Sequence, residues 1–172
     1  MPYTHSYFST LTINNWISVF EDFPKCYDVI YETLTYLTKE NIVTIYAFVV
    51  MRDHMHLLWK PSSAYEIITV VTKFKKFTGR KFRSHLQLYD SDYLDQYFMS
   101  NRKDRNFKFW KINSSNLLIQ HQDIFIQKIN YIHENPTKGD YKVCNNPIEY
   151  YHSSANSYKL SSSEFPFLTL VI

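Results

Sequence analysis

The stretch 42–60, IVTIYAFVVMRDHMHLLWK, decides the fold of this 172-residue chain. It holds two runs rich in β-branched and aromatic residues, separated by Arg52 and Asp53. Such runs on either side of a two-residue turn predict an antiparallel β-hairpin. His54 and His56 begin the return strand, where residues at i and i+2 point to the same face. The hairpin therefore presents two imidazoles side by side, a pair that can hold a divalent metal ion.

The rest of the chain supplies the elements of an α+β domain. Apolar residues three or four apart predict three helices, and aromatic or β-branched runs predict two more strands. The predicted helices span 24–39, 65–84 and 122–134, and the predicted strands span 3–14 and 106–119. The order strand, helix, strand, strand, helix, strand and terminal helix predicts a ferredoxin-like antiparallel sheet with packed helices and one added C-terminal helix.

Length and composition predict one domain. We assign residues 1–140 to it and treat 141–172, rich in Asn, Ser and Tyr, as an irregular tail packed on the same domain. Residues 86–99 lack clear periodicity and are interpreted as a connection. The N-terminus has no basic segment followed by an apolar stretch, and no apolar run is long enough to span a bilayer. We therefore expect a cytoplasmic protein with no signal peptide and no membrane partner.

Few residue types are available for other chemistries. With only two glycines, the chain cannot form a glycine-rich phosphate loop. The two cysteines, Cys26 and Cys144, form no CxxC pair, so a zinc knuckle or a disulfide framework is unsupported. We expect no small-molecule cofactor.

The net charge of +3 conceals two basic runs. Residues 73–83 carry six basic side chains and no acidic one, and residues 102–111 carry five basic and one acidic. Both runs place Phe or Trp between the cations, a pattern typical of nucleic-acid binding, although a solvated face is the alternative. At helical spacing the first run forms a stripe for phosphate contacts. Its members are Lys73, Lys76, Arg80 and Arg83.

The predicted helix 122–134 carries a second polar pair. Tyr131 and Asn135 are four residues apart and share one helical face, away from the apolar residues. A tyrosine becomes a nucleophile when a nearby metal or cation favours the phenolate, and an amide oxygen suits a hard cation such as Mg²⁺ or Mn²⁺. Glu134, three residues after the tyrosine, is the alternative oxygen ligand. Because the residue before proline avoids the α region, we expect Asn135 at a fraying helix end.

Three ordered motifs resemble one known family. MRDHMHLLW (51–59), YIHENPTKG (131–139) and PIEYYHSS (147–154) are similar to motifs of the single-tyrosine His-hydrophobic-His transposases, and within them of the REP-associated tyrosine transposases. The resemblance runs over residues 7–158. It implies a ferredoxin-like nuclease that cuts single-stranded DNA beside a hairpin with one metal ion. It also implies a 5′-phosphotyrosine intermediate, a free 3′-OH, and strand joining as the reverse attack.

The family pattern also implies roles for individual residues. By it, His54 and His56 are metal ligands, Tyr131 is the nucleophile and Asn135 is the third ligand, with Mg²⁺ or Mn²⁺ as the metal. The chain departs from the pattern before the first histidine, where the family usually has Pro-Asn and this chain has Arg-Asp. NPTKGDYKV also replaces the usual NPVKAGLV. These changes bear on substrate and accessory contacts more than on catalysis. Asp53 is either a partner for an imidazole N–H or only a turn residue.

Other functions remain open at this point. One is a non-catalytic, structure-specific single-stranded nucleic-acid-binding protein, a domesticated transposase relative. A further one is a metal phosphodiesterase that uses water in place of tyrosine. The enzyme requires the rings of His54 and His56 to converge near the Tyr131 hydroxyl, whereas a tyrosine that points into the core favours the binding protein. The tail favours a monomer over a dimer.

Overall fold

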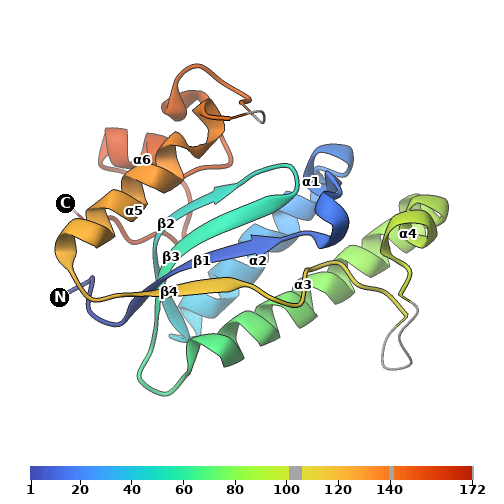
Figure 1. Cartoon of the computed structure of the whole chain (residues 1–172), viewed down its shortest axis with the longest axis horizontal. Helices are drawn as coiled ribbons and strands as arrows, with labels where there is room; N and C mark the ends of the chain where they lie inside the picture. The colour runs from blue at the N-terminus through green and yellow to red at the C-terminus, as the bar shows by residue number, and fades with distance from the viewer. Residues whose placement is uncertain (101–105, 140–141, 172) are drawn as a thin grey trace.

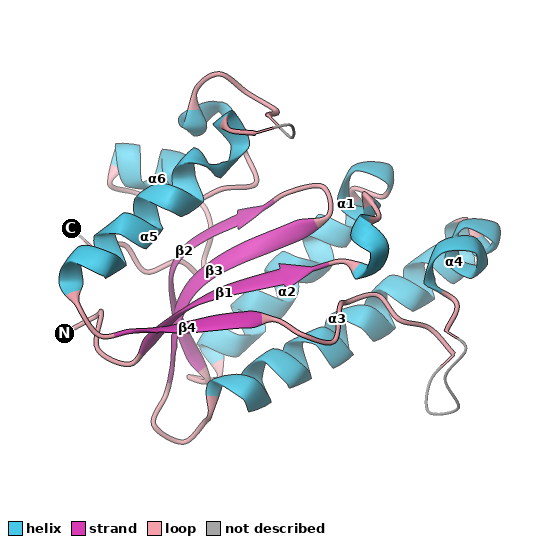
Figure 2. Cartoon of the chain, in the orientation of Figure 1, coloured by secondary structure: helices cyan, strands magenta, loops and turns pink. Residues whose placement is uncertain are grey.

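In a computed structural model, the chain folds into a four-stranded antiparallel sheet with helices on both faces (Figures 1 and 2). The structure describes residues 1–100, 106–139 and 142–171. The strands are β1 (Ser6–Thr12), β2 (Val43–Val50), β3 (His54–Pro61) and β4 (Ser115–Ile119). The helices are α1 (Val19–Asp22), α2 (Lys25–Lys39), α3 (Ile67–Tyr89), α4 (Ser91–Phe98), α5 (Gln122–Glu134) and α6 (Ala155–Leu160). The strand order β2-β3-β1-β4 is that of the predicted ferredoxin-like sheet, and the fold class is confirmed.

The predicted hairpin forms β2, at one edge of the sheet, and β3, an interior strand next to it. Val50 pairs with Met55 at the end of the β2–β3 ladder, and the Met51 N–H donates to the His54 carbonyl at 2.8 Å. Arg52 and Asp53 therefore form the two-residue turn. β3 pairs on its other side with β1, where Thr12 lies opposite His54. The register fixes which side chains share a face, because a slip of one residue would reverse them all.

The two faces of the sheet bury separate cores. Met55, Leu57 and Trp59 of β3 point to one face, where α2 and α3 cover them. Leu58 points to the other face, where it packs in a smaller cluster with apolar residues of α5. The α5 residues of that cluster are Phe125, Ile129 and Ile132. Because His54 and His56 alternate with Met55 and Leu57, they lie on the α5 face.

Two regions are more ordered than the sequence predicts. α3 continues to Tyr89, and residues interpreted as a connection form α4, which begins where the Asp90 carboxylate accepts from the Tyr93 N–H at 2.9 Å. Leu94 and Phe98, one turn apart, are its buried side chains. Acidic and polar residues surround them in a helix of only two turns, which is too short to show a clear hydrophobic periodicity in the sequence.

The C-terminal residues cover the free edge of β2. The Val50 N–H donates to the His152 carbonyl at 2.8 Å, and the Thr169 N–H donates to the Ile45 carbonyl at 2.8 Å. The Tyr150 hydroxyl donates to the Val50 carbonyl at 2.8 Å. These hydrogen bonds satisfy backbone groups at the β2 edge that would otherwise face solvent. The tail was predicted to be irregular, but it contains α6. No helix in the described residues has the length and apolar character needed to cross a membrane.

Candidate active site

The two histidines of β3 lie side by side on the α5 face. The ring centroids of His54 and His56 are 5.0 Å apart and the rings are inclined by 72°. His54 is partly exposed, whereas His56 is buried with 5% of its surface accessible. The i and i+2 spacing on a strand produces this juxtaposition, as predicted.

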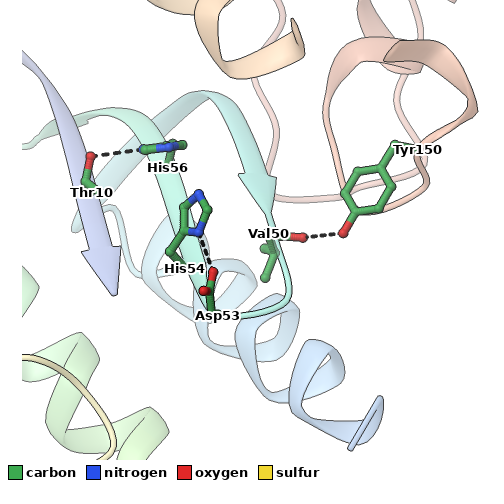
Figure 3. A network of polar contacts seen from close by, with 6 residues as sticks. All are labelled: Thr10, Val50, Asp53, His54, His56 and Tyr150. Atoms are coloured by element: carbon green, nitrogen blue, oxygen red, sulfur yellow. Dashed lines mark hydrogen bonds and ion pairs between the residues drawn. The ribbon is translucent and has the colours of Figure 1, made fainter. Parts of the chain in front are cut away.

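A hydrogen bond fixes one ring nitrogen of each histidine (Figure 3). The His54 Nδ1 lies 2.6 Å from the Asp53 Oδ1, and the His56 Nδ1 lies 3.0 Å from the Thr10 Oγ1. A carboxylate only accepts, so the His54 Nδ1 carries the hydrogen and its Nε2 keeps a lone pair. In both rings Nε2 is thus the nitrogen left for a metal ion, with Asp53 and Thr10 orienting the rings from behind.

Burial keeps the second imidazole neutral. Loss of solvation lowers the pKa of His56 to about 3, and the nearby charges of His54 and Lys128 act in the same direction. A metal ligand must be the neutral imidazole, so this environment prepares His56 for coordination at neutral pH. The donor set fits a divalent cation.

Tyr131 comes from α5 to the same place. Its ring centroid lies 5.3 Å from that of His56, with the rings inclined by 72°. Phe8 of β1 stacks on His56 at 5.3 Å and meets Tyr131 edge-on at 5.6 Å. The tyrosine is 47% exposed, so it lies outside the core and accessible to a substrate. The tyrosine thus does not point into the core, which is the arrangement that would have favoured the binding protein.

Lys128 adds a cation that the sequence reasoning missed. Its Nζ lies 4.8 Å from the Phe8 ring centroid and 5.4 Å from that of Tyr131. It precedes the tyrosine by three residues, a spacing that places both on one helical face. This spacing is the sequence signal from which Lys128 could have been predicted as part of the site. The ammonium stands where it can attract a phosphate toward the tyrosine.

The third ligand remains a prediction. Asn135 is half-buried and lies one turn beyond Tyr131, as the spacing predicts. Asn135 lies at the end of α5, as expected, but the expectation that it avoids the α region is wrong, because its φ of −52° and ψ of −44° are helical and a 3₁₀ turn, Asn135–Thr137, follows. The Glu134 carboxylate instead pairs with the Lys138 ammonium. Within the described ranges, no three His, Cys, Asp or Glu side chains form a group that could hold a metal.

The predicted basic stripe divides in two. Lys76, Arg80 and Arg83 line a groove of about 820 Å³ between α3 and residues 106–112. Lys73 does not line it, and its Nζ lies 5.7 Å from the Tyr65 ring centroid. The groove does not contain the histidine pair. Of the second basic run, residues 102–105 lie outside the described part of the chain.

Comparison with known proteins places these features in a family. The family described as IS200-like transposases matches residues 3–115, about two thirds of the sequence. The chain belongs to the IS200-like transposase family. The matched region contains His54 and His56 but ends before Tyr131 and Asn135. The resemblance to single-tyrosine transposases is thus confirmed at the level of the family, whereas the residue roles remain predictions. No curated protein matches the chain.

Solved structures share the fold of this IS200-like transposase. A REP-associated tyrosine transposase bound to a REP hairpin is 14% identical with a TM-score of 0.64, over 100% of this chain and 94% of the other. A candidate transposase from Deinococcus radiodurans R1 is 19% identical with a TM-score of 0.50, over 78% of this chain and 92% of the other. At these identities the likeness establishes the fold. The first match extends it over the tail.

Proposed function

We propose that this transposase-family protein is a metal-dependent endonuclease and strand transferase. It cleaves single-stranded DNA beside hairpins, through a 5′-phosphotyrosine intermediate, in the cytoplasm. The observation that carries the proposal is the exposed Tyr131 ring 5.3 Å from the ring of His56. A tyrosine with only a structural role has no need to stand exposed beside two imidazoles whose Nε2 atoms are free.

The chain's own groups supply most of the reaction. The Tyr131 oxygen attacks the phosphorus in line, the bond from phosphorus to the 3′-oxygen breaks, and the phenol proton ends on the departing 3′-OH. Lys128, near the ring of Tyr131, attracts the phosphate and disperses its charge. The reverse attack by a 3′-OH on the phosphotyrosine joins strands and restores the tyrosine. The buried Phe8 ring contacts both Tyr131 and His56 and so holds their rings in position relative to each other.

A divalent ion completes the proposed site. His54 and His56 would hold it through Nε2 and Asn135 through its amide oxygen, with Glu134 as the alternative to Asn135. A bound Mg²⁺ or Mn²⁺ supplies Lewis-acid polarisation of the scissile phosphate. Oxygen ligands and few protein donors suit these ions, which keep several waters and bind substrate phosphates.

A covalent adduct tests the proposal directly. We expect a DNA hairpin library with randomised single-stranded flanks to give a protein–DNA band on a denaturing gel with Mn²⁺ and none with EDTA. Tyr131→Phe should abolish the band, because only the hydroxyl is removed. Tyr151→Phe, at a tyrosine 57% exposed elsewhere, should retain it. An adduct that persists in Tyr131→Phe contradicts the assignment.

The basic groove favours one other function. Because it lies apart from the histidine pair, it could hold a hairpin without any cleavage. This non-catalytic binding protein predicts affinity unaffected by EDTA and no adduct with any oligonucleotide. A phosphodiesterase that uses water predicts the opposite pair, cleavage with metal but no adduct.

We further propose that residues 1–140 and 141–172 act together as one monomeric unit. The tail hydrogen-bonds to the β2 edge at residues 45, 48 and 50, so a second copy cannot pair there. Light scattering after size-exclusion chromatography is expected to give the mass of one chain, 20.7 kDa. A mass of two chains contradicts the monomer.

A further inference from the structure

The groove beside α3 is lined by cations from two segments. Its charged side chains are all basic: Lys75, Lys76, Arg80, Arg83, Lys108 and Lys111. No acidic residue is among the described residues that line it. Phe107 and Phe109 supply apolar surface, and the Arg83 guanidinium carbon lies 4.8 Å from the Phe107 ring centroid. A wide channel with cations and aromatic rings fits a phosphate backbone better than a small molecule.

The two walls of the groove are fixed to each other. The Lys75 Nζ donates to the carbonyls of Lys111 and Ile112 at 2.8 and 3.3 Å. The Trp110 Nε1 donates to the Thr78 Oγ1 at 2.8 Å beneath the groove. Lys75 is thus engaged in structure, and a ligand would meet the other five cations, of which Arg83 and Lys111 lie on aromatic rings. The channel is therefore pre-formed.

An unusual tryptophan stands at one end of the groove. Trp16 is 61% exposed, whereas Trp59 and Trp110 are buried. Both Asn15 and Trp16 have φ of 55°, a left-handed conformation that is uncommon for a bulky side chain. The Lys111 Nζ, which also belongs to the groove, lies 2.8 Å from the Trp16 ring centroid. An exposed indole held in a strained backbone needs a reason beyond packing.

Hydrogen bonds connect the segment of Lys111, which contacts Trp16, to the hairpin that carries the histidines. The Lys111 N–H donates to the Thr12 carbonyl, and the Ile13 N–H donates to the Asp53 carbonyl, both at 2.8 Å. Thr12 lies opposite His54 in the sheet. Two inter-strand steps of about 4.8 Å therefore separate the Lys111 backbone from that of His54, about 10 Å in all. A single-stranded flank of a few nucleotides, at about 3.4 Å each, is long enough to pass from the Lys111 segment to the histidine strand.

We propose that the groove and Trp16 form one DNA-binding subsite outside the catalytic centre. The groove holds the backbone phosphates of the hairpin, and Trp16 stacks on an unpaired base where the strand turns toward His54. The base displaces the Lys111 ammonium from the indole face, and that ammonium then contacts the adjacent phosphate. The inference rests on the proposed function, because it assumes a hairpin with a single-stranded flank. Beyond that function, the inference names the residues that would distinguish paired from unpaired DNA.

Binding without cleavage tests the subsite. Anisotropy of labelled DNA is measured with Tyr131→Phe protein in EDTA, for a hairpin with thymidine tails and for the same hairpin without tails. We expect Trp16→Ala to weaken binding of the tailed hairpin by about 10-fold, within the range for one stacked base, and to leave the blunt hairpin unchanged. Trp16→Phe should recover part of the loss. Tyr36→Ala, at an aromatic residue 58% exposed on α2, is the matched control and should change neither affinity.

Intrinsic fluorescence gives an independent readout. Of the three tryptophans only Trp16 is exposed, so thymidine oligonucleotides should quench a solvent-accessible component that Trp16→Phe lacks. Equal binding of the tailed hairpin by wild type and Trp16→Ala, or no quenching at saturation, overturns the stacking site. Absence of any hairpin binding overturns the groove as well. Retained binding with no Mn²⁺-dependent adduct contradicts the proposed catalysis and leaves the subsite standing.

Discussion

The proposed catalytic face and the α3 groove are built in opposite ways. On the catalytic face, short hydrogen bonds and ring contacts hold neutral imidazoles, with His56 buried and its Nδ1 fixed by Thr10. In the groove, exposed or half-buried cations on long side chains surround an open volume of about 820 Å³. A small displacement of a catalytic group lowers the rate of the chemical step. Affinity for a polyanion, in contrast, is the sum of contributions from many charges whose exact positions matter less. Substitutions in the two regions should therefore differ in kind as well as in size.

The largest effect is expected at the buried histidine. His56→Ala removes a proposed metal ligand and the ring against which Phe8 stacks. Mn²⁺-dependent adduct formation should fall by more than the about 100-fold that a lost outer-shell partner costs. Hairpin affinity in EDTA should be unchanged, because the groove does not include this residue. A parallel loss of affinity would show that the two regions are not independent.

A smaller loss is expected behind the metal site. Asp53→Asn keeps an acceptor for the His54 Nδ1–H but removes the carboxylate charge that lies 2.6 Å away. Metal affinity should fall by about 10- to 100-fold, as is typical for such partners. Titration of the adduct rate with Mn²⁺ measures this as a shift of the midpoint at unchanged maximal rate. An unchanged midpoint would make Asp53 a turn residue only.

How far the sequence predicts this molecule depends on how local each signal is. The helix over Gln122–Glu134 has the predicted bounds, because a periodic apolar stripe and a proline are both local. Tyr131 and the histidines were found through spacing and family resemblance, and the structure brings them together. The order within the tail, including α6, was not predicted, because it depends on hydrogen bonds to β2 about 100 residues away. Trp16 carries no sequence signal, since its importance rests on a left-handed φ.

Loss of groove cations should act through salt dependence. Arg80→Ala and Arg83→Ala are each expected to weaken hairpin binding uniformly across sequences and to reduce the slope of log K against log salt by about 1. The rate of adduct formation at saturating DNA should not change. Lys39→Ala, at an exposed cation on α2, is the control for net charge. A lower saturated rate in the arginine variants would mean that the groove also positions the scissile phosphate.

The tail should make stability depend on pH in the acid range. His152 accepts or donates a 2.6 Å hydrogen bond with the Tyr31 hydroxyl and stacks on Tyr27, and burial lowers its pKa to about 4. The unfolded chain, with a histidine pKa of about 6.5, binds this proton more readily. Stability contributed by neutral His152 is therefore present above about pH 6.5 and falls as the pH drops toward 4.

Urea unfolding between pH 7 and 4.5 measures this dependence. His152→Gln keeps a polar partner for Tyr31 but does not titrate, so its stability should fall less steeply with acid than that of the wild type. Some slope should remain, because burial also lowers the pKa of His133 to about 4. Identical slopes in both proteins would assign the acid sensitivity to histidines outside the tail.

The smallest effect tests the looser packing of the groove. Gly79 lies within α3 on the groove wall, and a Cβ there would lie 3.7 Å from the Phe109 Cδ2, an ordinary contact. Gly79→Ala should raise the free energy of unfolding by about 0.5–1 kcal/mol, because alanine loses less backbone freedom in a helix, and should leave hairpin affinity unchanged. A similarly small change on the other face, Phe8→Leu, removes the ring between His56 and Tyr131 and should lower the adduct rate. If Gly79→Ala instead destabilises the protein or weakens binding, the groove is as closely fitted as the catalytic face, and the contrast between positioned and diffuse phosphate recognition fails.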